Sequence, residues 1–124
     1  MHITILTEPK EYSRQAIATL RTLGPVVSWQ EARRRPATLK RATILAVKLG
    51  MKISAPLMDR LPRLKIIGTS TTGLNHIDMA EAKRRGIGVV SLRGETKFLK
   101  TIFLAWLVIY YQETTNFYQI KPLF

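Results

Sequence analysis

The segment LPRLKIIGTSTTGLNHIDMAEAKRRGIGVVSLRGET, residues 61–96, contains two short apolar strands separated by a helix. We expect the strands at Lys65–Gly68 and Gly88–Leu92, because both are short apolar runs bounded by turn residues. Between them, Asn75–Arg85 predicts a helix with a small apolar face that ends at Gly86. This series of strand, helix and strand is typical of a βαβ unit.

The residues before this unit predict more elements of the same kind. Three further strands are expected at His2–Thr7, Val26–Trp29 and Ala42–Val47. Apolar spacing and stop residues predict helices at Glu11–Leu23 and at Ser54–Leu61, the second with Ser54 as its N-cap and Pro56 in its first turn. The segment Glu31–Leu39 is ambiguous, because Pro36 interrupts a helical pattern.

Five strands that alternate with helices predict an α/β fold with a parallel five-stranded sheet and helices on both faces. We expect the flavodoxin-like strand order 2-1-3-4-5. In such sheets a ligand binds at the carboxyl ends of the strands, close to the point where the strand order reverses. This geometry brings together the loops Glu8–Lys10, Lys48–Lys52 and Thr69–Gly73.

One of these loops has the composition of an anion site. In GTSTTGLNHID, Gly68–Asp78, a strand runs through small polar residues into the start of a helix, so that several backbone N–H groups can point outward. Such a nest suits a carboxylate or a phosphate. From the residues alone an ordinary turn is an equally good interpretation, because Ser, Thr and Gly are common in turns.

Two other patterns suggest chemistry but do not fit it. The segment GIGVVS, Gly86–Ser91, imitates the start of a dinucleotide-binding loop, yet it follows a helix and opens a strand, the reverse of the required order. We expect His76 and Asp78, two residues apart at a helix start, to point to different sides, with Asp78 complementing the helix dipole. No residues have the spacing of metal ligands, and no catalytic residue is predicted.

The run Leu61–Thr96 resembles the N-terminal lobe of the D-isomer-specific 2-hydroxyacid dehydrogenases, the family that includes phosphoglycerate dehydrogenase. There a strand ends in a glycine-rich turn, Asn or Asp precedes Ile-Asp, and a helix runs to Arg-Arg-Gly-Ile before the next strand. The resemblance follows the order of elements from Ile3 to Lys100 and is specific from Ala46 onward. It implies a substrate-binding lobe of an NAD-dependent oxidoreductase that acts on small 2-hydroxy or 2-oxo acids.

The resemblance also implies the residues of a site. Backbone amides at Thr72 and Gly73 would hold the substrate carboxylate, while Leu49 and Met51 would line the pocket. The family usually has a second glycine where this chain has Thr71, which puts the fit of the turn in doubt.

After GETKFLKTI the chain departs from the family, which continues into a nucleotide-binding domain with a glycine-rich NAD loop and the catalytic Arg, Glu and His. No catalytic or cofactor residue therefore carries over, and we expect the chain alone to bind no NAD and to be inactive. We divide it into a lobe at residues 1–97 and, at 98–124, an apolar C-terminal helix with an irregular tail, produced by truncation or a change of reading frame.

The apolar run in this C-terminal part, FLKTIFLAWLVIYY at Phe98–Tyr111, is too short for a membrane span, which needs about 20 apolar residues. We expect residues 98–112 to form a helix that mediates self-association. The absence of cysteine and of a secretory signal favours the cytoplasm.

The net charge of +12, from 20 Lys and Arg against 8 Asp and Glu, leaves two other function classes open. A basic nucleic-acid-binding module is one, although the basic residues are scattered and no aromatic residues are interleaved with them, so we expect no specific nucleic acid as a partner. A stand-alone interaction protein that docks through its apolar C-terminal helix is the other.

Overall fold

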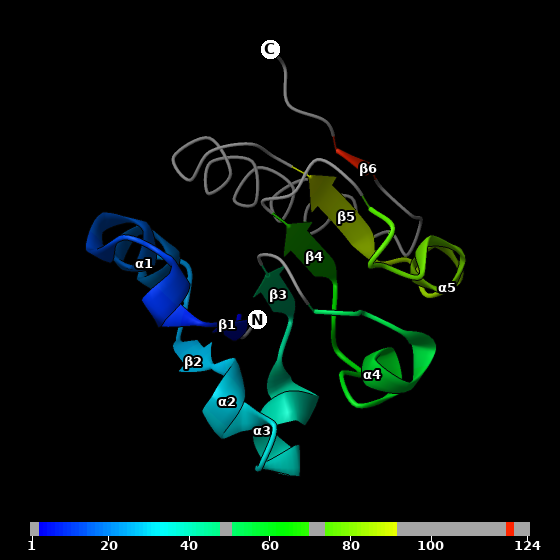
Figure 1. Ribbon diagram of the computed structural model, residues 1–124. Coiled ribbons are helices and arrows are strands. Elements are labelled where there is room, and N and C mark those ends of the chain that lie inside the picture. Colours follow the sequence, from blue (N-terminus) through cyan, green and yellow to red (C-terminus); the bar gives the residue numbers. More distant parts are fainter. Residues whose placement is uncertain (1–2, 48–50, 70–73, 92–118, 121–124) are drawn as a thin grey trace.

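The computed structural model describes residues 3–47, 51–69, 74–91 and 119–120. Its centre is a parallel sheet in the order β2-β1-β3-β4-β5-β6, with all strands pointing the same way (Figure 1). The first five strands are β1 (Ile5–Thr7), β2 (Val26–Ser28), β3 (Ile44–Val47), β4 (Ile66–Thr69) and β5 (Gly88–Ser91). The predicted strand order 2-1-3-4-5 is therefore confirmed.

A sixth strand, β6 (Gln119–Ile120), extends the sheet beyond the five that the pattern predicts. It pairs in parallel with β5, with Val89 opposite Gln119 and Val90 opposite Ile120. The sequence of this strand has no alternation long enough to mark it. The predicted apolar helix at residues 98–112 and the boundary between residues 97 and 98 lie outside the described residues.

The helices are shorter than their patterns predict. They are η1 (Pro9–Glu11), α1 (Arg14–Arg21), α2 (Trp29–Ala32), α3 (Pro36–Arg41), α4 (Ala55–Asp59) and α5 (Met79–Arg84). The ambiguous segment Glu31–Leu39 falls in α2 and α3, which are separate because Pro36 starts the second of them. Ser54 occupies the N-cap of α4 as predicted, although its side chain makes no capping hydrogen bond.

Strands β1 to β4 contribute side chains to two apolar clusters on opposite faces of the sheet, as alternation requires. On one face α1 packs Ala16, Ile17 and Leu20 over β1 and β3. On the other face α2 to α5 pack over the sheet and contribute Ala32, Leu39, Met58 and Ala82. The prediction of helices on both faces is confirmed, and a fully buried leucine such as Leu20 stabilises this core by about 1.5–3 kcal/mol.

Two turns depend on glycine. Gly86 has a φ of 71°, and the N–H groups of Gly86 and Ile87 bond to the carbonyls of Lys83 and Ala82 at 3.1 and 2.9 Å, which closes α5 with a Schellman motif. Gly24 lies so close to the first strand that a Cβ would be 2.2 Å from the carbonyl oxygen of Ile3. The prediction that Gly86 caps its helix is confirmed.

Among the described residues, no helix combines the length and the apolar character that a membrane crossing requires.

Candidate functional site

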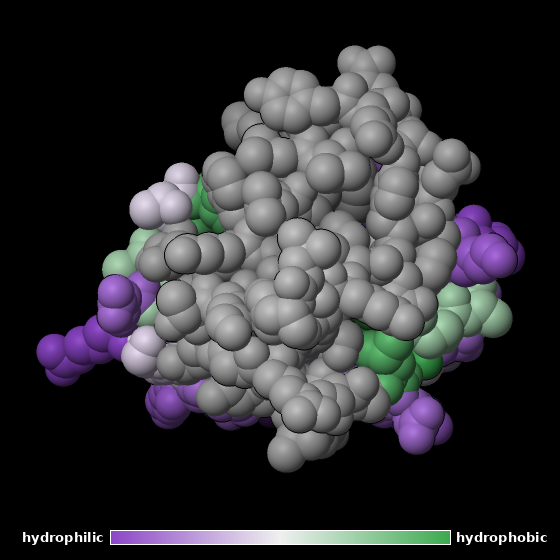
Figure 2. All heavy atoms as spheres, turned by 90° about the horizontal axis from the view of Figure 1, so that it is seen from above, coloured by the Kyte–Doolittle hydropathy of each residue, from purple (hydrophilic) through white to green (hydrophobic). Residues whose placement is uncertain are grey.

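The carboxyl ends of the central strands form the edge at which the sequence predicts a ligand site. At this edge the buried hydroxyl of Thr7, the last residue of β1, donates to the carbonyl of Ala46 in β3 at 2.8 Å. Thr69, the last residue of β4, is fully buried. Figure 2 shows the molecule from above, and hydrophilic side chains of the described residues project at the periphery of this view.

Two loops leave this edge from neighbouring strands, and their far ends are joined by main-chain hydrogen bonds. The N–H of Ile53 donates to the carbonyl of His76 at 2.7 Å, and the carbonyl of Ile53 accepts from the N–H of Asp78 at 2.9 Å. Ile53 and Ile77 therefore form an isolated parallel bridge, and both side chains are buried in the core. This bridge places the segment that precedes α4 beside the segment that precedes α5.

A second contact closes the loop after β4 at its base. The Oγ1 of Thr69 and the Nε2 of His76 lie 3.2 Å apart, so that the residue before the turn contacts a residue after it. Because Thr69 is buried, this polar contact is protected from water and is stronger than an exposed one.

The predicted start of the helix at Asn75 is wrong. The pattern predicts a helix from Asn75, whereas α5 begins only at Met79, after the extended bridge at Ile77. Asp78 is the N-cap, and its Oδ1 accepts the N–H of Glu81 at 3.0 Å. The start of α5 is therefore already capped by a carboxylate of the chain itself.

Of the four predicted site residues, Met51 is described and the other three, Leu49, Thr72 and Gly73, are outside the described residues. Met51 is half-buried and packs against the apolar cluster that contains Ile53 and Ile77. Leu74, which the sequence reasoning did not single out, packs against the same cluster from the other loop. Its position as the first apolar residue after the turn was the signal that could have identified it.

Glu8, in the loop after β1, is held away from β4. Its Oε1 accepts hydrogen bonds from the hydroxyl of Ser28 at 3.1 Å and from the N–H of Gln30 at 2.7 Å. The carboxylate thus binds the start of α2 on the side of β2, at the opposite side of β1 from β3 and β4. This arrangement places the negative charge of Glu8 beside β2 and α2 rather than beside β4.

Charged side chains join α5 to α4 beside the site. Glu81 accepts hydrogen bonds from Arg84 and Arg85, and these contacts lower the pKa of its carboxyl to about 2. Arg85 also binds Asp59, and the hydrogen bonds to Asp59 and Glu81 raise the pKa of its guanidinium. These contacts hold the end of α5, and thus the bridge at Ile77 that precedes it, against α4.

No group of three potential metal ligands exists among the described ranges, which hold one histidine, His76. The dinucleotide-loop imitation at Gly86–Ser91 is also explained, because Gly86 ends α5 and Gly88 begins β5. Among the described residues there is thus neither a group of metal ligands nor a glycine loop between a strand and a helix start.

Comparison with known proteins identifies this architecture. The family described as "D-isomer specific 2-hydroxyacid dehydrogenase, catalytic domain" matches residues 5–96. The chain belongs to this family. The match includes both loops and the bridge between Ile53 and Ile77.

Individual members of the family are more distant. The erythronate-4-phosphate dehydrogenase of Shewanella sp. (strain MR-4) is 34% identical over 65 residues, which are 52% of this chain and 17% of that protein. The glyoxylate reductase of Thermofilum pendens is 49% identical over 43 residues, 35% of this chain and 13% of that enzyme. The matched part of the chain is therefore a small share of the length of either relative.

Solved structures of the family have the same fold. The NADPH-dependent glyoxylate/hydroxypyruvate reductase of Sinorhizobium meliloti, solved with NADP and malonate, superposes with a TM-score of 0.61 at 25% identity, over 76% of this chain and 29% of that one. The D-lactate dehydrogenase of Aquifex aeolicus, solved with NAD and lactic acid, gives 0.62 at 23% identity over 89% and 36%. The latter likeness concerns the fold alone.

Proposed function

We propose that this chain is the substrate-binding lobe of an NAD-dependent D-2-hydroxyacid dehydrogenase and that it binds the carboxylate of a small 2-hydroxy or 2-oxo acid. In this proposal the backbone N–H groups of Thr72 and Gly73 hold the carboxylate. Leu49 and Met51 form the apolar wall of the pocket. The side chain of Leu74, packed on the same cluster as Met51, adds to that wall.

The main support for this proposal is that two contacts fix the ends of the loop after β4. Its base is closed by Thr69 and His76, and its far end is fixed to the loop after β3 by the bridge between Ile53 and Ile77. A turn that binds an anion through backbone N–H groups must hold those groups in place before the anion arrives, because ordering them on binding would weaken affinity. Family membership supports the same assignment.

The charges around the site support an anion as its ligand. Glu8 is already bound to Ser28 and Gln30, and Asp78 is already bound to the N–H of Glu81. The carboxylates of Glu8 and Asp78 are therefore both satisfied within the protein. Lys52 is exposed in the segment that precedes Ile53 and adds positive potential on the side where the acid would approach.

We propose that the chain binds and orients the acid but does not transfer the hydride. NAD supplies the hydride chemistry in this family, and the sole glycine-rich imitation in the described chain is used by the end of α5. His76 is engaged with the hydroxyl of Thr69 and has no carboxylate partner within the described ranges, so we assign it to positioning the turn. Proton transfer and cofactor binding would then require residues that this lobe does not provide.

Binding of the acid without hydride transfer can be tested with the purified chain. We expect no oxidation of NADH in the presence of glyoxylate, pyruvate or hydroxypyruvate, and no heat of NAD binding in calorimetry at micromolar concentrations. Pyruvate and D-lactate should nevertheless bind weakly, because the lobe lacks the closure that excludes water. Turnover that co-purifies with the chain, or micromolar affinity for NAD, would contradict the proposal.

Two further parts of the proposal concern the surroundings of the chain. We propose the cytoplasm as its location, on the grounds of composition given above. We also propose that any nucleic-acid binding is weak, independent of sequence and lost steeply as salt rises, because it would depend on scattered basic side chains alone. Titration of a labelled duplex at two salt concentrations tests this expectation.

A further inference from the structure

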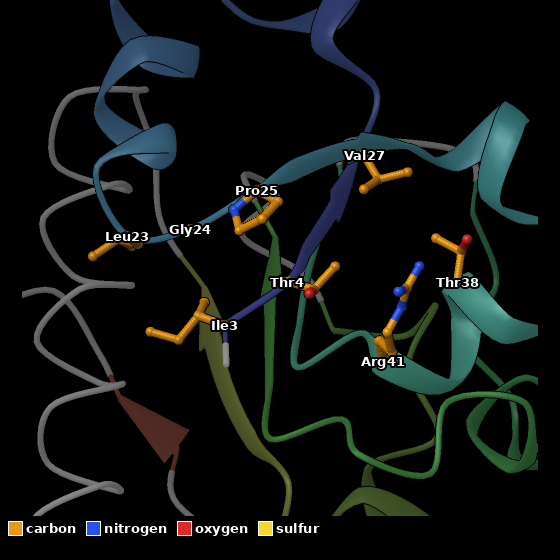
Figure 3. A pocket seen from close by; sticks show the side chains of 8 residues that line it. All are labelled: Ile3, Thr4, Leu23, Gly24, Pro25, Val27, Thr38 and Arg41. Atoms are coloured by element: carbon orange, nitrogen blue, oxygen red, sulfur yellow. The ribbon is translucent and has the colours of Figure 1, made fainter. Parts of the chain in front are cut away.

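A cavity of about 600 Å³ lies at the amino ends of the strands, at the opposite edge of the sheet from the proposed substrate site (Figure 3). It opens where the chain enters β1 and β2 and where α3 ends. One wall is apolar and is formed by Ile3, Leu23, Pro25 and Val27. The other wall belongs to α3 and presents Thr38 and Arg41.

The backbone around this cavity is tightly fixed. The carbonyl of Pro25 accepts a hydrogen bond from the N–H of Ile5 at 2.9 Å, and the close approach of Gly24 to Ile3 leaves no space for a Cβ. On the other side Thr43 is bound to Thr4, where its hydroxyl accepts the N–H of Thr4 at 3.1 Å. The cavity is thus formed by segments that core hydrogen bonds hold in place, which is typical of a preformed pocket.

Arg41 gives the cavity its chemical character. In Figure 3 its guanidinium lies between Val27 of β2 and Thr38 of α3, facing Thr4 across the cavity. No hydrogen bond or ion pair joins the Arg41 side chain to another of the described residues. The guanidinium is exposed, and its five N–H donors are therefore available at a concave surface that also has an apolar wall.

We propose that this cavity, which we call the amino-edge pocket, binds a small amphipathic anion, with its carboxylate or phosphate on Arg41 and Thr38 and its apolar part against Val27, Pro25 and Leu23. Arginine binds both acid groups through paired, charge-assisted hydrogen bonds. The volume is within the range of small-molecule sites, roughly 300–1,000 Å³.

The amino-edge pocket is distinct from the proposed substrate site. Ligands of the reaction are expected at the carboxyl ends of the strands, whereas Ile3, Pro25 and Arg41 all precede the strands that they adjoin. A ligand here would not contact the reacting atoms. Its binding would show a second site, and this inference does not depend on the proposed enzymatic function.

Nuclear magnetic resonance of the isotope-labelled full chain tests this inference, with phenylacetate, phenyl phosphate and the neutral phenylacetamide as probes. We expect saturable shifts for the amides of Thr4, Val27 and Arg41 with either anion, at a dissociation constant on the order of 1 mM, and no saturable shifts with phenylacetamide. A larger effect of phenyl phosphate than of phenylacetate would identify phosphate as the preferred group. Equal shifts by the neutral amide would overturn the role of the anion.

Two matched substitutions locate the site. Arg41→Gln should weaken binding of both anions about tenfold, because it removes a charge-assisted pair. Arg21→Gln is the control, since Arg21 is also exposed and also the last residue of its helix but does not line the cavity. Retained binding in Arg41→Gln, or an equal loss in Arg21→Gln, would show that the amino-edge pocket does not bind these anions. Unchanged spectra of both variants without ligand would show that their folds are intact.

Discussion

Ile53 and Ile77, 24 positions apart in the chain, form a parallel bridge in which the main chain of Ile53 bonds to the residues on either side of Ile77. Neither residue belongs to a strand of the main sheet, and both side chains are buried. The bridge joins the two loops that would enclose a substrate carboxylate. The segments around Ile53 and Ile77 are therefore joined by backbone hydrogen bonds as well as by side-chain packing.

The contact between His76 and Thr69 should contribute to both stability and ligand binding. His76→Ala leaves the buried hydroxyl of Thr69 without this partner, so we expect the free energy of unfolding to fall by about 1–2 kcal/mol. The affinity for pyruvate should fall about tenfold, because the turn is less well ordered before binding. Urea denaturation and calorimetry measure the two effects.

His76→Gln and Asn75→Ala are the controls for this prediction. The amide of glutamine can reach the hydroxyl and should restore most of the affinity, and exposed Asn75 should have little effect on either quantity. If His76→Ala loses stability but binds pyruvate as the parent chain does, the contact supports the fold without shaping the site.

Two glycine substitutions should differ in severity for separate physical reasons. Gly24→Ala would place a Cβ 2.2 Å from a backbone carbonyl oxygen, which cannot move without shifting β1, so we expect a loss of about 3 kcal/mol or more. Gly86→Ala only imposes a left-handed backbone on alanine, at about 1–2 kcal/mol. Thermal unfolding of both variants compares them, and a reversed order would show that the approach of Gly24 to Ile3 is relaxed easily.

The Glu81 carboxyl should titrate far below an ordinary glutamate. Its pKa is lowered to about 2 by hydrogen bonds from Arg84 and Arg85. Because the pKa of Glu81 is lower in the folded chain, its ionised carboxylate stabilises the folded state. This contribution to the free energy of unfolding is complete above the unfolded pKa of 4.5 and is lost as the pH falls toward 2. Carbon-detected nuclear magnetic resonance should find this pKa, and Arg84→Gln and Arg85→Gln should each raise it. A pKa near 4.5 in the parent chain would contradict the contact.

The sequence predicts the sheet well because most of its strands are buried apolar runs, and because glycine or proline residues mark where helices and strands end. The apolar run before Lys48 and the pair Gly86 and Gly88 fix β3, the end of α5 and the start of β5 with little ambiguity. The site is harder to predict, because Ile77 reads as part of a helix face until the bridge to Ile53 is known. That bridge is a non-local contact, and local periodicity carries no information about it.

The apolar run at residues 98–112 leads to a prediction about association. We propose that it mediates self-association, because an apolar segment of this length needs a surface to cover it. Sedimentation of the chain should show dimers or larger species, and Leu107→Glu combined with Ile109→Glu should reduce them. A monomer at high concentration in the parent chain would contradict this proposal.

We propose that the turn after β4 binds a carboxylate through the amides of Thr72 and Gly73. The most direct measurement is a titration of the isotope-labelled chain with pyruvate and D-lactate, followed at every backbone amide, with neutral lactamide as the control. We predict saturable shifts that are largest at Thr72 and Gly73, that extend to Met51 and His76, and that are absent with lactamide. Shifts confined to other parts of the chain, or equal shifts with lactamide, would contradict the assignment of this lobe to substrate binding.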